Sequence, residues 1–132
     1  MATLHVVVVT PEKTAVDATA DFAVVPLFDG ELGIGSNHTP LIGKLGHGEL
    51  RLKRGNETTR YYLDEGFVQV RDNTVVVLTG TVSKVEDIDV KAAQEQLEKA
   101  LAMVPTTDDE FAERDRLLAE ARAQLHASRR HF

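Results

Sequence analysis

The sequence predicts an α+β protein, in which an N-terminal β-sandwich of short, mainly antiparallel strands is followed by a C-terminal antiparallel hairpin of two helices. Three observations support this prediction. The first part of the chain is rich in β-branched and aromatic residues that are interrupted by frequent turns. After Val85 the helix formers Glu, Lys, Ala, Gln and Leu take over. Pro105 divides this second part in two, so we expect one domain over residues 1–85 and another over residues 86–132.

Six stretches of the first domain have the composition of strands, and turn-forming pairs such as Asp29-Gly30 lie between them. The stretches are residues 4–9, 21–25, 50–53, 59–63, 67–70 and 74–78. Short strands with frequent turns are typical of a sandwich or a barrel. Charged residues alternate with leucines over residues 49–53, which predicts one solvent-exposed face, whereas residues 75–78 have no polar side and should be buried on both. A two-layer β domain accounts for both patterns.

An apolar stripe predicts the first helix of the second domain. The helix should end before Pro105, because the residue before a proline avoids the α conformation. Along one face lie Val90, Leu97, Leu101 and Val104, with Ala93 and Ala100 beside them.

The second helix is predicted to begin after Thr107, its N-cap, and the acidic residues 108–110 fit a capping box and the positive end of the helix dipole. Its stripe repeats every seven residues and consists of Phe111, Leu118 and Leu125, with Ala121 between them. Both stripes are thin and rich in alanine. Burial of roughly a few hundred Å² at about 25 cal/mol per Å² stabilises their contact by only a handful of kcal/mol. We therefore expect a hairpin that is able to open.

Composition excludes several classes of function. A formal net charge of -6 argues against general nucleic-acid binding, which needs a basic face. The absence of cysteine excludes disulfides, thiolate nucleophiles and cysteine zinc sites. The sequence shows no signal peptide, and no run approaches the roughly 20 apolar residues that cross a bilayer, so we expect a soluble chain.

Charge is distributed unevenly over the second domain. Residues 86–113 carry nine acids and two lysines, whereas residues 114–132 carry five arginines and two acids. The arginines form either an ordinary solvated helix face that suits the C-terminal end of the dipole or a surface for an acidic partner.

No motif predicts a catalytic residue, a nucleotide site or a metal site. Gly33 and Gly35 match part of a phosphate loop, but neither Gly-Lys-Ser/Thr nor a helix follows them. We interpret His38 and His47 as surface-loop histidines, because no cysteine or carboxylate cluster has the spacing of metal ligands. Ser36 lacks the Gly-x-Ser-x-Gly context of an activated nucleophile.

The most informative segment, residues 29–50, holds six of the nine glycines. It reads Gly-Glu-Leu-Gly-Ile from Gly30, Asn-His-x-Pro-Leu from Asn37 and Leu-x-x-Gly-x-Leu from Leu45. In this order and spacing the motifs resemble the epsilon subunit of F-type ATP synthases. The resemblance covers nearly the whole chain, from Val-Thr-Pro-Glu at residues 9–12 to Asp-Ile-Asp at residues 87–89.

This resemblance implies a non-catalytic subunit of the central stalk, which sits on gamma and on the membrane ring of c subunits and couples proton flow to rotation. The residues that match the family loop facing the ring are Gly30, Glu31, Leu32, Gly33 and Ile34. The residues that match the gamma interface are Thr10, His38 and Pro40. A docking surface that is rigid before binding loses less entropy on binding, which gives the shaped, glycine-rich loops a physical reason.

The resemblance also implies that the C-terminal helices regulate the complex. In the family they lie folded on the sandwich or extend into the alpha/beta catalytic head, where basic residues meet acidic ones on beta and ATP hydrolysis is blocked. The candidates here are Arg114, Arg116, Arg122, Arg129 and Arg130. One exposed ion pair contributes about 0 to 1 kcal/mol, so inhibition requires several arginines acting together.

One departure from the family pattern argues against a cofactor. Members that bind ATP carry Ile/Leu-Asp-x-x-Arg-Ala, whereas this chain has Ala92 at the arginine position, three residues after Asp89. We expect no cofactor, with a weak regulatory ATP site at Asp89 and Arg122 as the alternative.

The expected location is the cytoplasmic face of a bacterial plasma membrane, where the chain is peripheral and contacts the membrane only through the complex; a plastid thylakoid is the second choice. Two other hypotheses remain open. One is a stand-alone adaptor, whose sandwich and hairpin bind another partner. The other is a small hydrolase that uses His38.

Overall fold

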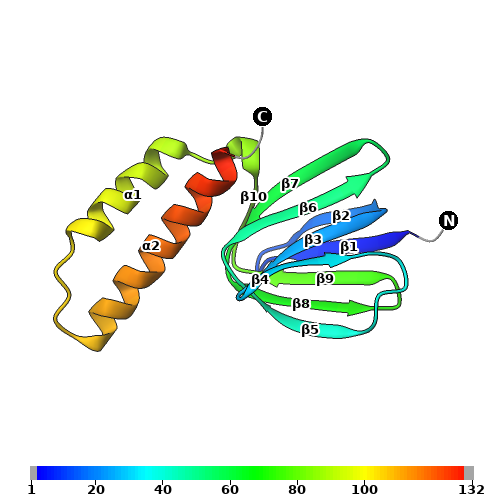
Figure 1. Cartoon of the computed structure of the whole chain (residues 1–132), viewed down its shortest axis with the longest axis horizontal. Coiled ribbons are helices and arrows are strands. Elements are labelled where there is room, and N and C mark those ends of the chain that lie inside the picture. Colours follow the sequence, from blue (N-terminus) through cyan, green and yellow to red (C-terminus); the bar gives the residue numbers. More distant parts are fainter. Residues whose placement is uncertain (1–2, 130–132) are drawn as a thin grey trace. The chain divides into compact units, whose positions relative to one another are not determined.

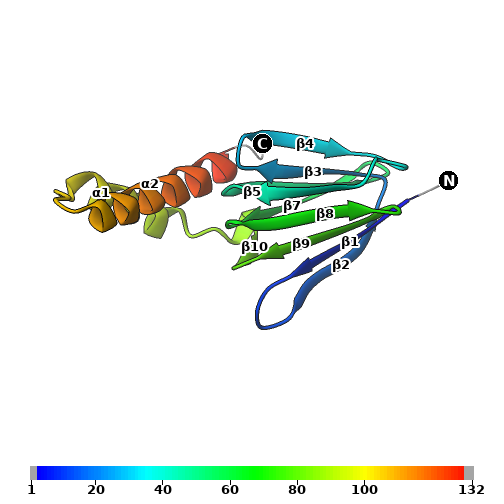
Figure 2. The same cartoon turned by 90° about the horizontal axis from the view of Figure 1, so that it is seen from below.

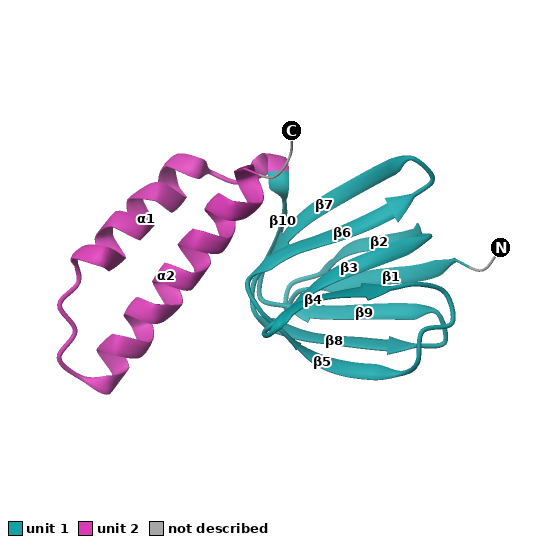
Figure 3. Ribbon diagram, in the orientation of Figure 1, with its two compact units in different colours: residues 1–85 teal, residues 86–132 magenta. Residues whose placement is uncertain are grey.

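The computed structural model describes residues 3–129 of the chain. These residues form two compact units that meet after Val85, the first within residues 1–85 and the second within residues 86–132 (Figure 3). Each unit is described by itself below.

Ten strands build the first unit (Figure 1). They are β1 (Leu4–Val9), β2 (Thr14–Ala20), β3 (Phe22–Leu27), β4 (Gly30–Ile34), β5 (Leu41–Leu45), β6 (Gly48–Arg54), β7 (Glu57–Leu63), β8 (Gly66–Arg71), β9 (Thr74–Thr79) and β10 (Val82–Lys84). Five of the six stretches predicted from composition lie within these strands, and the stretch 21–25 begins one residue before β3. The sequence did not predict β2, β4, β5 and β10, which are short, small-residue-rich or interrupted by glycine.

The strands follow the order β10-β7-β6-β3-β5-β8-β9-β1-β2, with β4 paired to β3. The chain of strands folds over between β3 and β5, which share only the Leu27–Leu45 pair. Two layers result, one of β10, β7, β6, β3 and β4, the other of β5, β8, β9, β1 and β2 (Figures 1 and 2). Among the described strands only β1 and β9 pair in parallel. The predicted sandwich of mainly antiparallel strands is therefore confirmed.

Aliphatic side chains from both layers fill the core. The largest fully buried ones are Leu4, Val6, Val8, Val25, Ile34, Leu45, Leu50, Leu63, Val68, Val70, Val75 and Val77. The prediction that residues 75–78 are buried on both faces was wrong. Val75 and Val77 face the core, whereas Leu78 points outward and is 50% exposed, because the pleat sends alternate side chains to opposite faces.

The second unit is a hairpin of α1 (Val90–Ala102) and α2 (Asp108–Arg129), reached through a short 3-10 turn (Val85–Asp87). Asp89 caps α1, since its carboxylate accepts a hydrogen bond from Ala92 N at 3.0 Å. Thr107 caps α2 as predicted, because its Oγ1 accepts from the Glu110 backbone N at 3.1 Å. The Glu110 carboxylate accepts from Thr106 N instead of Thr107 N, so the expected reciprocal box is shifted by one residue.

The two helices pack through small residues. On α1 the buried residues are Ala93 and Ala100, and on α2 they are Leu118, Ala121, Leu125 and Ala127. The predicted α1 stripe was therefore misplaced: Val90 and Leu101 are half exposed, because the alanine side of the helix faces the hairpin interior. Gln96 Nε2 donates to Leu117 O at 3.0 Å, and Arg114 Nε donates to Ala100 O at 3.1 Å.

Neither helix within residues 3–129 combines the length and apolar character that crossing a membrane requires.

Candidate functional site

The segment expected to face a ring of subunits is mostly a strand, which corrects the prediction of a loop. β3 and β4 form a hairpin whose turn includes Phe28, 69% exposed, and Gly30, whose φ of 141° lies in the region that favours glycine. Glu31 and Leu32 follow on β4. Ile34, at the end of the strand, is fully buried in the core, so its side chain offers no contact to a partner.

Glu31 is tied across the sheet to Arg51 of β6. Arg51 Nη1 donates to Glu31 Oε2 at 2.9 Å, and Nη2 donates to Oε1 at 3.4 Å. This carboxylate raises the pKa of Arg51 above its ordinary value, because it favours the charged guanidinium. The Glu31 side chain stays 45% exposed and is available to a partner.

A band of apolar side chains lies on the outside of the other layer. Ile42 and Phe67 are 74% and 56% exposed, and Phe67 pairs directly with Leu78 across β8 and β9. Half-buried valines of β1 and β9 continue the band on the same face. We call the following residues the outer apolar face: Val7, Val9, Ile42, Phe67, Val76 and Leu78.

Two hollows lie at opposite ends of β8 and β9. The first, of about 360 Å³, is mainly apolar and is bordered by Thr10, Gly66 and Leu78. Thr10 itself is buried, and its hydroxyl donates to Lys13 O at 3.3 Å. The second hollow has a volume of about 390 Å³. Its lining is Asn37, His38, Pro40, Asp72 and Asn73.

The structure thus brings His38 and Pro40 together, but it separates them from Thr10 by the length of β8. Val9 and Leu78 of the outer apolar face line the first hollow, and the second hollow lies at the other end of β8 and β9. Sequence analysis missed this face. The available clue was the run of apolar residues 75–78, since a strand with one face in the core must present its other apolar side chains outward.

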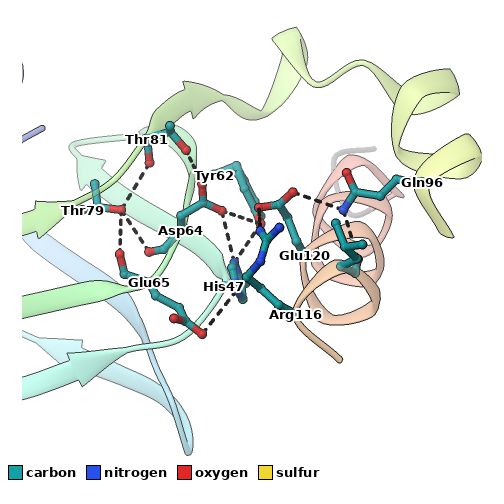
Figure 4. A network of polar contacts seen from close by, with 10 residues as sticks. His47, Tyr62, Asp64, Glu65, Thr79, Thr81, Gln96, Arg116 and Glu120 are labelled. Carbon is teal, nitrogen blue, oxygen red and sulfur yellow. Dashed lines mark hydrogen bonds and ion pairs between the residues drawn. The ribbon is translucent and has the colours of Figure 1, made fainter. Parts of the chain in front are cut away.

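His47 lies in the loop between β5 and β6, as the sequence suggested, but its side chain is only 10% exposed. Its Nδ1 lies 3.1 Å from Asp64 Oδ1, which also accepts a hydrogen bond from Tyr62 Oη at 3.2 Å (Figure 4). The hydroxyls of Thr79 and Thr81 donate to backbone and carboxylate oxygens of this cluster. The Thr79 and Thr81 hydroxyls bond oxygen atoms rather than the imidazole, whereas Tyr62 Oη lies 3.4 Å from His47 Nδ1 as well as 3.2 Å from Asp64 Oδ1.

His38 also lacks the partners of a catalytic base. Its Nδ1 donates to the neighbouring Thr39 O at 2.7 Å. Within residues 3–129 the structure places neither a carboxylate nor a hydroxyl in hydrogen-bond contact with the His38 ring.

The candidate arginines of α2 differ in the hydrogen bonds and ion pairs that they make. Arg114 is bonded to α1, as described above, and Arg116 pairs with Glu113 at 2.9 Å. Arg122 and Arg129 lie further along the helix. Arg130 is outside the described residues.

The two residues of the alternative ATP site lie on different elements of the hairpin, Asp89 just before α1 and Arg122 on α2. The Asp89 carboxylate is occupied as the α1 cap, and no hydrogen bond or ion pair links it to Arg122 in the described part of the chain.

Comparisons with known proteins agree with this architecture. Residues 3–85 match the family described as ATP synthase, Delta/Epsilon chain, beta-sandwich domain. The chain is 44% identical to the ATP synthase epsilon chain of Rhodopirellula baltica, over 96% of this chain and 98% of that one. It is 36% identical to the chloroplastic ATP synthase epsilon chain of Emiliania huxleyi, over 94% and 97% of the two chains.

Two solved structures share the fold. One is a chain of the Euglena gracilis mitochondrial ATP synthase, with a TM-score of 0.87, 19% identity and coverage of 96% of this chain and 82% of that one. The other belongs to the central stalk and c ring of the Tetrahymena thermophila mitochondrial ATP synthase, with a TM-score of 0.73, 18% identity and coverage of 96% and 97%.

Proposed function

Because the chain belongs to the ATP synthase epsilon chain family, we propose that it works in the central stalk of an F-type ATP synthase, where its sandwich docks on gamma and the c ring. It is a subunit of the synthase and not a catalytic one. Its proposed task is mechanical: it couples proton translocation through the ring to rotation of the stalk. Family membership favours this role over the adaptor and hydrolase hypotheses.

The observation that carries gamma docking is the outer apolar face. Clustered, exposed apolar side chains on a small soluble domain mark protein–protein contact sites. Here they stand on paired strands, with Phe67 directly opposite Leu78, so little order has to be gained on binding. The predicted interface residues Thr10, His38 and Pro40 border the hollows at either end of this face.

Phe67→Asp tests the assignment. An aromatic anchor at the centre of an interface contributes about 2 kcal/mol or more, so the affinity for gamma should fall at least about tenfold. The fold should persist, because Phe67 is exposed and Lys44, opposite it on β5, can pair with the new carboxylate. Thr58→Asp is the matched control, an exposed strand position opposite Lys53 in the other layer. Unchanged gamma affinity of Phe67→Asp would overturn the assignment.

The proposed ring contact is the β3–β4 hairpin. Phe28 is exposed at its turn, and Glu31 presents a carboxylate beside it. Gly30, Leu32 and Gly33 shape the hairpin, whereas Ile34 anchors it in the core.

We further propose that the α1–α2 hairpin regulates ATP hydrolysis by extending into the alpha/beta head. The small-residue contact between the helices supports this, since it opposes rearrangement weakly. Arg122 and Arg129 are the first candidates for contact with beta, while Arg114 and Arg116 must exchange their present partners. ATP is proposed to have no dedicated site, because Asp89 serves as a cap and Ala92 replaces the family arginine.

The synthase is a membrane-associated complex. We propose that the chain lies at the cytoplasmic face of a bacterial plasma membrane, in keeping with its identity to the epsilon chain of Rhodopirellula baltica. Its membrane contact is then indirect, through the c ring.

A further inference from the structure

In the β3–β4 hairpin, β4 is the edge strand that carries Glu31. Within the described strands β4 pairs with β3 alone. Ile34 anchors one end of β4 in the core, but Gly30 and Glu31 at the other end are exposed. Backbone hydrogen bonds from Phe28 N to Lys44 O at 2.9 Å and from Gly46 N to Pro26 O at 3.0 Å join the turn and β3 to β5. They do not reach Glu31, which lies on the edge strand β4 and depends on side-chain contacts for one fixed orientation.

The register places Arg51 in position to supply that support. Val24 of β3 pairs with Arg51 of β6 on one side and with Gly33 of β4 on the other, and Pro26 pairs with Glu31. Directly paired residues project to the same face, so Arg51 and Glu31 share the outer face of this layer. Two strand spacings of about 4.8 Å each separate their strands, and Glu31 also lies two residues before Gly33, the β4 residue in line with Arg51. The two long side chains span this distance and meet in the two hydrogen bonds described above.

A buried ion pair fixes the other side of Arg51. Arg60 of β7 donates to both oxygens of Glu49, from Nε at 2.7 Å and from Nη2 at 2.6 Å, and the Glu49 side chain is only 4% exposed. Arg51 Nη1 lies 3.6 Å from Glu49 Oε1. Arg51 and Arg60 are directly opposite each other, an arrangement of like charges that the intervening Glu49 compensates. Acids and arginines therefore alternate from the buried pair outward to Glu31.

We propose that Arg51 is a positioning residue for ring docking, which holds the Glu31 carboxylate and the turn end of β4 in one orientation for an oligomeric ring of c subunits. This inference rests on the proposed function of the hairpin. Glu49 keeps Arg60 when Arg51 is replaced, so the sandwich does not depend on Arg51 for its buried charge. What Arg51 controls is the order of the strand edge that carries Glu31.

The first test uses the isolated full-length chain and does not depend on docking. Arg51→Gln should speed amide hydrogen exchange of residues 30–34 about two- to fivefold, the effect expected of a partly exposed ion pair, while β8 and β9 stay unchanged. Glu31→Gln should do the same, and the double variant should exchange no faster than either single one. Arg51→Lys keeps the charge but loses the two-pronged guanidinium, so its exchange rate should lie between those of wild type and Arg51→Gln. Unchanged exchange in Arg51→Gln, or additive effects in the double variant, would overturn the proposal.

The second test measures binding of the full-length chain with gamma to a detergent-solubilised c ring. Arg51→Gln should weaken ring binding about two- to fivefold and leave gamma affinity unchanged. Full ring affinity in Arg51→Gln would refute positioning for docking. Failure of the wild-type chain to bind the ring would instead refute the proposed function. The hydrogen-exchange result would then still report whether the Arg51–Glu31 ion pair orders residues 30–34.

If Arg51→Gln does not fold, Arg51→Lys carries both tests. A thermal unfolding curve that matches wild type then establishes that Arg51→Lys is folded, so that its effects concern the orientation of Glu31 and β4. Changed exchange and ring binding in this folded variant would support the proposal, and unchanged values of both would overturn it.

Discussion

The sandwich and the helical hairpin are held together by different kinds of contact. In the sandwich, leucine, isoleucine and valine side chains from two layers are fully buried, and seven of the ten described strands have a paired neighbour on both sides. In the hairpin, alanines form much of the buried contact, while Val104 and Phe111 near the connecting loop remain exposed. Fully buried aliphatic residues stabilise by about 1.5 to 3 kcal/mol each, and alanines by much less. The sandwich is therefore suited to be a rigid base, and the hairpin to move.

The largest expected effect on stability comes from truncating one buried leucine in each unit. Leu50→Ala in the sandwich should lower the free energy of unfolding by about 2 to 5 kcal/mol, because a cavity is left among packed aliphatic side chains. Leu118→Ala in α2 should lower it by only about 1 to 2 kcal/mol, since the surrounding contact is thin. Urea unfolding followed by residue-resolved hydrogen exchange measures both. Equal losses of unfolding free energy in the two variants would contradict the proposed difference between sandwich and hairpin.

A glycine pair tests the rigidity of the sandwich next. A Cβ at Gly66 would meet the backbone carbonyl of Leu78 at 1.8 Å, and backbone cannot move aside as a flexible side chain does. Gly66→Ala should therefore destabilise the unit by about 2 to 3 kcal/mol and disturb β8–β9 pairing. Gly80→Ala meets nothing within 4 Å and should stay close to wild type, within about 0.5 kcal/mol. The measurement is thermal unfolding, and similar melting temperatures for the two variants would contradict the close approach.

The α2 cap offers a smaller and local effect. Thr107→Ala should cost about 1 kcal/mol, because the Glu110 backbone N loses its acceptor. Exchange in the first turn of α2 should quicken while the sandwich is unaffected, and Thr107→Ser should restore the wild-type rate. Faster exchange throughout the sandwich in Thr107→Ala would show that the two units do not behave separately.

The smallest effect concerns the surface pair of the hairpin. Arg116 donates a hydrogen bond to the Glu113 carboxylate and holds the pKa of Glu113 below its ordinary value. A lowered folded-state pKa means that this contribution is present at neutral pH and is lost as the pH falls through that lowered pKa. Arg116→Gln should move the Glu113 pKa upward in a carboxyl NMR titration. An unchanged titration would show that the ion pair is not formed in solution.

The sequence predicted those parts of the fold that depend on local chemistry. Strand-forming composition located six strands, and the Thr107 cap marked the start of α2. What it did not predict depends on neighbours across the sheet. Glycines at Gly30 and Gly33 concealed β4, whose pairing with β3 is a tertiary property.

The same limit applies to the candidate site. The alternation at residues 49–53 predicted an exposed polar face, yet Glu49 is buried, and Arg60 on the next strand compensates its charge. Likewise, Ile34 belongs to the matched family motif but lies in the core. A one-residue change of register would reverse which face each of these side chains occupies, and sequence alone does not set that register.

The central claim is that the sandwich docks and the hairpin regulates. The most direct test is ATP hydrolysis by a matched alpha-beta-gamma core, titrated with the full-length chain and with residues 1–85, after circular dichroism has established that the shorter chain is folded. The account predicts that both bind gamma with similar affinity and that only the full-length chain slows hydrolysis. Equal inhibition by residues 1–85, or loss of their gamma binding, would contradict it.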